Sequence, residues 1–302
     1  MNLTVALAAM DDSMGSMSSM PHGWHLSSLW IIGVLLIGIE ELGMRRLRQR
    51  CTGRRRRSWR ARAWLLESSI AIVCLIDSSP LMGASMSHMT IHMLIHVVEM
   101  FYIPILLIVA APFVPALFAL PVGTRRTLLR WWYVGPGRPV ATLASRAAAA
   151  PILVIVVFNA TMIFWHLPKV FDWAARHWAV HTWLMTPSYI VAGYLFWRLL
   201  LGSHPRPPRA SLKFQAIAVI VTSFEMVILA MAMAIFSKAA WYDTYVVALG
   251  IRPALHDQQL AAGILWICGD FWAPAAIILI VRRAMDSGTG LSDAFERSLG
   301  RA

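Results

Sequence analysis

Seven stretches of the chain are apolar over a length that can cross about 30 Å of hydrocarbon as a helix. Flanking charges and helix breakers place them at residues 26–44, 61–79, 86–110, 149–167, 180–201, 213–236 and 257–284. An eighth apolar stretch, residues 112–122, carries three prolines and is too short to span, so we expect it to extend the third segment or to lie at the interface. The pattern predicts an all-α fold, a polytopic integral membrane helical bundle with about seven transmembrane helices.

Basic residues are unevenly divided between the loops on the two sides of this predicted bundle. The loops after the first, third, fifth and seventh segments carry 23 of the 27 Lys and Arg side chains. Because such residues collect in cytoplasmic loops, we expect a multi-pass membrane protein with its N-terminus outside and its C-terminus cytoplasmic. The chain then divides into an extracytoplasmic Met/His-rich segment (1–25), a seven-helix membrane domain (26–285) and a cytoplasmic tail (286–302).

Composition supports the membrane and argues against nucleic acid as a partner. Hydrophobic residues make up 58% of the chain and charged residues 14%, yet the formal net charge is +12. The basic residues lie in short runs between apolar segments, so we expect the lipid bilayer to be their partner. Cys51, Cys74 and Cys268 are far apart, which argues against a disulfide framework and against a thiol-based metal carrier. The N-terminal segment lacks a basic n-region, and we expect it to remain on the mature protein.

The third segment concentrates side chains that are costly in a bilayer. His88, His92 and His96 are spaced by four, and Glu99 follows three residues later, so all four share one helical stripe at 100° per residue. Imidazole and thioether groups suit copper, and thioethers favour the cuprous ion, although iron, zinc and nickel also accept imidazole. The thioethers lie on the adjoining stripe, formed by Met86, Met89, Met93 and Met100.

The spacing of these histidines limits how they can bind a metal. His88 and His96 are separated by about 12 Å along a helix, so the three cannot bind one ion together. Either neighbouring histidines join ligands from another helix, or the stripe is a ladder along which an ion moves. The alternatives without a metal are proton carriers, hydrogen-bonded packing residues and a methionine stripe that belongs to the core.

Further candidate ligands lie outside the third segment. The extracytoplasmic start places methionines close together and follows them with two histidines, a composition that can capture cuprous ion or can belong to a tail without function. Nine of the ten histidines fall outside or in the outer half of the predicted bundle, and His204 is the exception. Acidic residues in or near the spans serve as metal-site supports, helix caps or proton carriers; these are Glu67, Asp77, Glu225, Asp257 and Asp270.

Five motifs in order resemble the CtaG-type cytochrome c oxidase assembly factors of bacteria, over roughly residues 30–285. They are SHMTIHMLIH (87–96), AAPFVPALFALP (110–121), FWHLPKVFDWA (164–174), His181 with YLFWRLL (194–200), and DQQLAAGILWICGDF (257–271). The resemblance implies a seven-helix protein of the bacterial plasma membrane that helps to deliver or insert copper into the oxidase catalytic subunit. It falls on His88, His92, His96, His166 and His181, and Met185 stands where the family tends to carry a second histidine.

The sequence therefore predicts a copper-binding assembly factor rather than an enzyme, since it lacks a nucleophile-base constellation, a phosphate loop and an NAD fingerprint. The expected cofactor is copper in the cuprous state, and the expected partners are the oxidase catalytic subunit and other copper chaperones. The alternatives are a haem-binding electron-transfer protein and a copper or proton transporter. The predicted metal ligands are His88, Met89, His92, Met93, His96, His166, His181 and Met185 in the membrane, and Met14, Met17, Met20, His22 and His25 before it.

Overall fold

A computed structural model of the chain describes residues 23–203, 208 and 210–286. The predicted ligands Met14, Met17, Met20 and His22, and nearly all of the predicted tail, lie outside these residues. Within the described residues the long elements are helices, as the sequence predicts.

The helices follow one another with short connections. In chain order they are α2 (Leu29–Gln49), α3 (Gly53–Ser78), α4 (Pro80–Ser85), α5 (Met89–Val97), the π-helix η1 (Val98–Tyr102), α6 (Ile103–Ala110), α7 (Phe113–Ala119), α8 (Val122–Tyr133), α9 (Arg138–Ala147), α10 (Pro151–His166), α11 (Pro168–Arg176), α12 (Trp178–Val180), the π-helix η2 (His181–Met185), α13 (Thr186–Leu201), α14 (Leu212–Met231), the π-helix η3 (Ala232–Phe236), α15 (Asp243–Leu249) and α16 (Ile251–Asp286).

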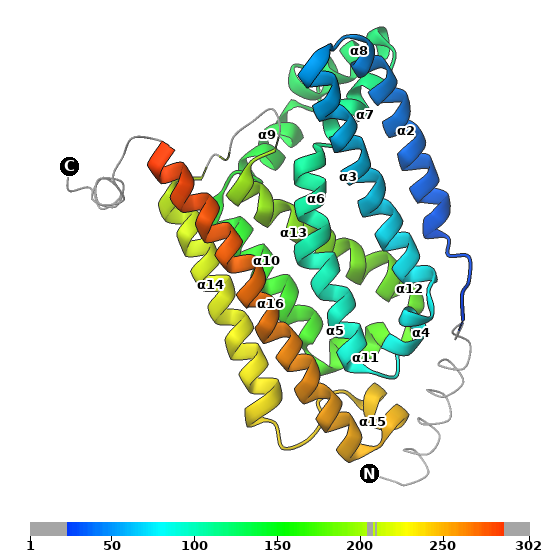
Figure 1. Cartoon of the computed structure of the whole chain (residues 1–302), viewed down its shortest axis with the longest axis vertical. Helices are drawn as coiled ribbons and strands as arrows, with labels where there is room; N and C mark the ends of the chain where they lie inside the picture. The colour runs from blue at the N-terminus through cyan, green and yellow to red at the C-terminus, as the bar shows by residue number, and fades with distance from the viewer. Residues whose placement is uncertain (1–22, 204–207, 209, 287–302) are drawn as a thin grey trace, which may run out of the picture.

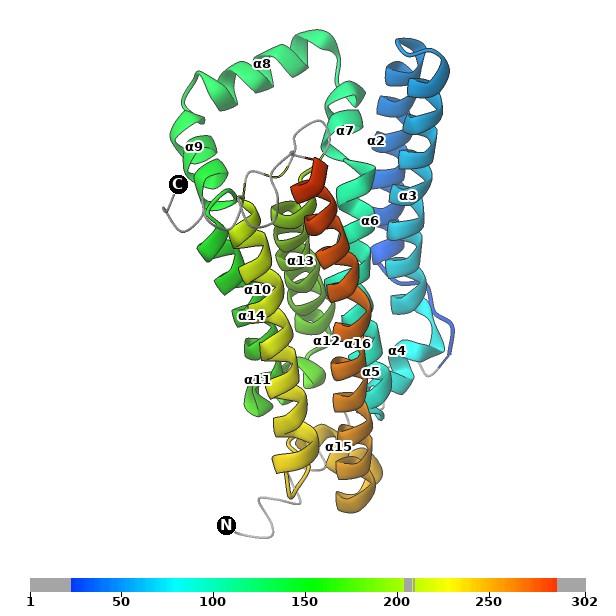
Figure 2. The ribbon, with the colours of Figure 1, turned by 60° about the vertical axis from the view of Figure 1, so that its left-hand side comes forward.

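The long helices run side by side along the long axis of the molecule (Figure 1). The α2/α3 hairpin lies on one flank, the α14/α16 pair lies on the other, and α5, α6, α10 and α13 fill the middle. Figure 2 shows α8 crossing one end of the bundle, whereas α4, α11 and α15 lie towards the opposite end. The interior of the bundle is therefore formed mainly by the middle helices.

Four helical segments among the described residues are long and apolar enough to cross a membrane: Met89–Ala110, Trp178–Leu201, Leu212–Phe236 and Ile251–Met285. A fifth is present if α9 and α10, which meet at a bend of 75°, count as one broken span. The two other predicted segments do form helices, but α2 carries Glu40, Glu41 and arginines, and α3 carries an arginine run with Glu67 and Asp77. The helical membrane protein is confirmed, whereas seven spans are not.

The core between the middle helices and α16 is aromatic. Phe158 of α10 stacks on Phe196 of α13 with ring centroids 4.3 Å apart, and Phe101 of η1 packs edge-on to Phe158 at 5.4 Å. Trp272 of α16 contacts both Phe101 and Phe196. These large side chains leave little space between α5, α10, α13 and α16 on the side of the molecule nearer α8.

Gly193 lets α13 approach η1 closely. A Cβ atom at this position would lie 2.1 Å from the Met100 carbonyl oxygen and 2.6 Å from the Pro104 side chain, so no larger residue fits without a shift of the backbone. This contact brings the middle of α13 against η1, which contains Glu99.

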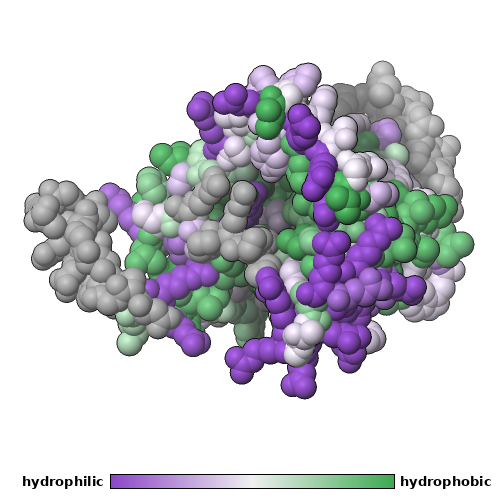
Figure 3. All heavy atoms as spheres, turned by 90° about the horizontal axis from the view of Figure 1, so that it is seen from above, coloured by the Kyte–Doolittle hydropathy of each residue, from purple (hydrophilic) through white to green (hydrophobic). Residues whose placement is uncertain are grey.

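The two ends of the bundle differ in polarity. Seen from the end where α8 lies, hydrophilic side chains gather on the surface (Figure 3). Exposed arginines contribute from the end of α2, the start of α3 and α8; they are Arg45, Arg46, Arg50, Arg54, Arg55, Arg56, Arg57, Arg60, Arg126 and Arg130. We call this surface the arginine end.

Candidate metal centre

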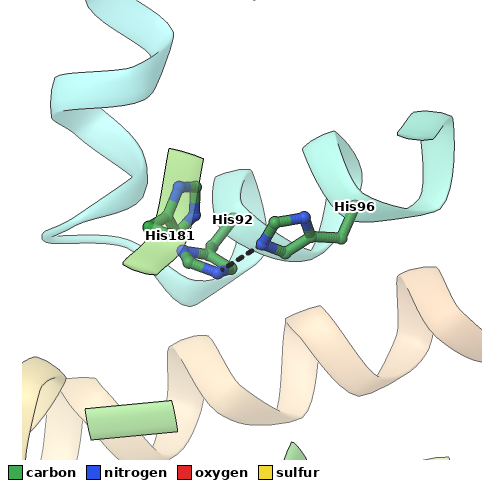
Figure 4. A group of neighbouring side chains, drawn as sticks. All are labelled: His92, His96 and His181. Atoms are coloured by element: carbon green, nitrogen blue, oxygen red, sulfur yellow. Dashed lines mark hydrogen bonds between the residues drawn. The ribbon is translucent and has the colours of Figure 1, made fainter. Parts of the chain in front are cut away.

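Three buried histidines meet near the end of the bundle opposite the arginines. His92 and His96 come from α5, and His181 is the first residue of η2. One ring nitrogen of each lies within 4.8 Å of one ring nitrogen of the other two. Their exposed fractions are 3%, 6% and 1%. Figure 4 shows the three rings turned towards one another, and we call them the histidine cluster.

The nitrogens of this cluster are poorly supplied with hydrogen-bond partners. His92 Nε2 and His96 Nε2 lie 2.8 Å apart, so a single hydrogen is all that fits between them. Both ring nitrogens of His181 and Nδ1 of His92 have no partner within the described part of the chain. Leaving a buried polar group unpaired costs about 1–3 kcal/mol. Each neutral imidazole has one lone-pair nitrogen, and three histidines whose ring nitrogens lie this close together are an arrangement that a metal ion would satisfy.

Glu99 fixes the orientation of one of these rings. Its carboxylate, 2% exposed, lies 2.7 Å from Nδ1 of His96, and the Thr186 hydroxyl donates to it at 3.2 Å. A carboxylate that accepts the Nδ1 hydrogen leaves Nε2 as the lone-pair atom and strengthens it as a ligand. Glu99 lies in η1, and His181 and Met185 lie in η2. Such π-helical turns occur frequently at functional sites.

A cavity of about 10 Å³ adjoins the cluster, close to the volume that one water-sized sphere requires. Imidazoles and thioethers share its wall with three aromatic rings. The lining residues are Met89, His92, Met93, His96, His166 and Met185, with Trp165, Phe171 and Tyr189. Six of the predicted ligands therefore surround one space, and His181 lies next to it.

His166 and Met185 are held in place by the hydrogen bonds of their surroundings. Nδ1 of His166 lies 2.7 Å from the Met162 carbonyl oxygen, which leaves Nε2 as the available ring nitrogen. The Trp165 indole donates to Ser188, whose hydroxyl donates to the Met185 carbonyl oxygen.

Tyr242 closes the arrangement by donating to the His166 carbonyl oxygen at 3.1 Å. Burial raises the pKa of Tyr242, so its hydroxyl stays protonated and continues to donate.

The start of α5 is set by a residue far away in the sequence. The Asp257 carboxylate, from α16, accepts hydrogen bonds from the backbone N–H groups of Met89 and Thr90 and from the Thr90 hydroxyl. It therefore caps α5 from another helix. Among the described acidic residues that the sequence offered as supports, it is the one that contacts the segment carrying His92 and His96.

His88 does not join the cluster, in contrast to the stripe that the sequence predicts. The residue precedes α5 in an extended conformation (φ −129°, ψ 113°), and its exposed side chain pairs with Ser87 at 3.0 Å. The predicted stripe requires a helix from residue 86, whereas the Asp257 cap starts the helix at Met89.

Other histidines lie apart from the cluster. His177 and His256 are exposed. Among the predicted ligands of the N-terminal segment, His25 is the one that the structure describes; it is half-buried and packs against Trp178.

Some residues of the site carry no signal in the sequence. Thr186 supports Glu99, and Phe171 and Tyr189 cover His92 and His96 with ring centroids 4.7 and 4.9 Å away. The pairing of His96 with Glu99 was not predicted either, and their three-residue spacing is the signal that could have indicated it.

Known proteins match much of the chain. Residues 41–287 match the family model described as cytochrome c oxidase caa3 assembly factor (Caa3_CtaG). The uncharacterized proteins Mb0105 of Mycobacterium bovis and MT0111 of Mycobacterium tuberculosis are each 28% identical over 206 residues, which is 64% of this chain and 29% of each relative. The chain thus spans less than a third of the length of these relatives. No solved structure matches it. The resemblance read from the five motifs is confirmed, and the chain belongs to the family of cytochrome c oxidase caa3 assembly factors.

Proposed function

We propose that this assembly factor binds cuprous ion at the histidine cluster and passes it to the catalytic subunit of cytochrome c oxidase. The observation that carries the proposal is the set of buried imidazole nitrogens without partners beside a cavity lined by methionine. A soft, neutral donor set of this kind favours cuprous ion over harder cations.

Charge balance supports the same choice. A buried charge is stable only when it is paired, and Glu99 is the carboxylate bonded to the cluster. One cuprous ion and one ionised Glu99 side chain would together be neutral, whereas a divalent ion would leave one excess positive charge in the buried site. Exchange with a partner then depends on ligands that are readily replaced, which thioethers provide.

The sidedness of the proposal follows from the positions of the charges. Arginines gather at one end and the histidine cluster lies towards the other. With the arginine end at the cytoplasmic face of a bacterial plasma membrane, the cluster would lie in the outer half, the N-terminus outside and the C-terminus inside. Of the seven spans in this topology, α2 and α3 would be the two outside the apolar helical segments described above.

The two rival functions find less support. A cavity of about 10 Å³ has no room for a haem, whose iron would also need two axial ligands on facing sides. A transport path would need polar groups beyond the cluster, but Phe101, Phe158 and Trp272 fill the described core on the side nearer the arginine end.

The test is copper binding by the purified full-length protein under reducing conditions. Wild type should hold about one cuprous ion against a competing chelator. The triple substitution His92→Ala/His96→Ala/His181→Ala should hold none, whereas the control His256→Ala, at an exposed site, should match wild type. Equal and negligible copper in wild type and triple variant would refute the proposal. Gel filtration and thermal unfolding confirm that each variant is folded.

A further inference from the structure

A stack of three rings connects the N-terminal segment to the histidine cluster. The Trp178 indole lies parallel to the His181 ring, with centroids 5.7 Å apart and an angle of 7° between the planes. His25 approaches the indole from further out, with centroids 6.5 Å apart at 66°. From the N-terminal segment inwards, the order is therefore His25, Trp178 and His181.

His25 is held in this position by the end of α3. Its backbone N–H donates to the Ser78 carbonyl oxygen at 3.1 Å, and the Trp30 indole donates to the Ser78 hydroxyl at 2.8 Å. Nδ1 of His25 is shielded from solvent and has no hydrogen-bond partner among the described residues. A further unpaired imidazole nitrogen thus lies outside the cluster, on a ring that contacts Trp178.

Trp178 is the weakest part of the enclosure around the cluster. The other rings in contact with it, those of Phe171, Tyr189 and Tyr245, are 4%, 1% and 2% exposed. Trp178 is only half-buried, and it is the first residue of the helical span Trp178–Leu201, at the junction with α11. The terminal turn of a helix opens at lower cost than the rest of the fold.

We propose that His25 and the face of Trp178 form an access site for cuprous ion, and that the indole must swing aside for the ion to pass from His25 to His181. Imidazole supplies a ligand for the ion, and an indole face attracts a cation. This proposal rests on the proposed function for the identity of the ion. The covering of His181 by Trp178 stands without it.

The cover is tested without metal, by acylation of neutral imidazoles with diethylpyrocarbonate and mass spectrometry of the His181 peptide. Trp178→Ala should raise the rate at His181 by about tenfold, because removal of the indole opens the shortest route to the ring. Trp178→Phe, which retains a ring, should lie between. The control Trp173→Ala removes an exposed indole that contacts His177, and it should leave His181 unchanged. If His181 reacts at one rate in all four proteins, Trp178 is not its cover.

The access site is tested with copper. His25→Ala should load cuprous ion several-fold more slowly than wild type and reach the same occupancy, and Trp178→Ala should release it faster to a chelator. Loading of His25→Ala at the wild-type rate would overturn the access site. If wild type binds no cuprous ion, the proposed function fails, and the acylation rates still decide whether Trp178 covers His181.

Discussion

The two ends of the bundle hold their charged and polar side chains in opposite ways. At the arginine end the side chains are exposed, and many form no ion pair with a carboxylate among the described residues. Their charges are therefore available to an anionic surface such as a lipid headgroup layer. At the other end His92, His96 and His181 are buried, and Glu99, to which the Thr186 hydroxyl donates, fixes the orientation of His96. The comparison teaches that a positive surface can interact with an anionic partner without fixed side-chain positions. The side chains of a metal site, in contrast, must each be held in one orientation.

The largest effect on copper affinity is expected at His181. Among the described residues it is the cluster histidine that comes from η2, and neither of its ring nitrogens has a hydrogen-bond partner. His181→Ala should weaken cuprous-ion affinity by about 100-fold or more, as measured by chelator competition. His177→Ala, four residues earlier and exposed, serves as the matched control. Unchanged affinity in His181→Ala would remove this residue from the ligand set.

Glu99→Gln should come next. The amide preserves shape and an acceptor oxygen but removes the charge that balances the ion, and changes in such supporting groups weaken metal binding by about 10–100-fold. Glu225→Gln is the control, since Glu225 lies in the apolar span formed by α14 and η3 and has no bond to a cluster histidine. An equal loss of affinity in both variants would show a general effect of charge rather than support of His96.

Asp257→Ala should act through α5 rather than through the ion. Loss of the cap should cost about 1–2 kcal/mol, seen as faster hydrogen exchange at Met89 and Thr90, with a smaller loss of copper affinity than in Glu99→Gln. Asp257→Asn keeps an acceptor oxygen and should recover part of both. Exchange rates that match wild type in the alanine variant would refute the cap.

Changes at the arginine end should affect copper least. Replacement of Arg54, Arg55, Arg56 and Arg57 by Gln should leave copper affinity unchanged and should lower the extra thermal stability gained in anionic over zwitterionic nanodiscs, because each arginine near such a surface contributes about 1 kcal/mol. A loss of copper affinity in this variant would mean that the two ends do not act independently.

Local patterns predicted much of the helical membrane fold and part of the site. Four-residue spacing placed His92 and His96 on one face, and the structure keeps them there. The predicted stripe was wrong in including His88, because α5 starts only at Met89, where Asp257 from 168 residues away caps it. Seven spans are not confirmed, because α2 and α3 carry charged residues such as Glu40 and Asp77. Hydropathy alone does not show how a bilayer would accommodate these residues. His181, His166 and Met185 were placed by family resemblance, since no local pattern connects them to α5.

The aromatic packing of Phe101, Phe158, Phe196 and Trp272 has a consequence for the order of events. It closes the site on one side, so an ion held at the cluster would leave by the route through which it arrived. We infer that the copper donor and the receiving oxidase subunit would have to occupy the same face in turn. Exchange would then be sequential, and an excess of apo-oxidase subunit should slow the loading of the assembly factor instead of leaving it unaffected.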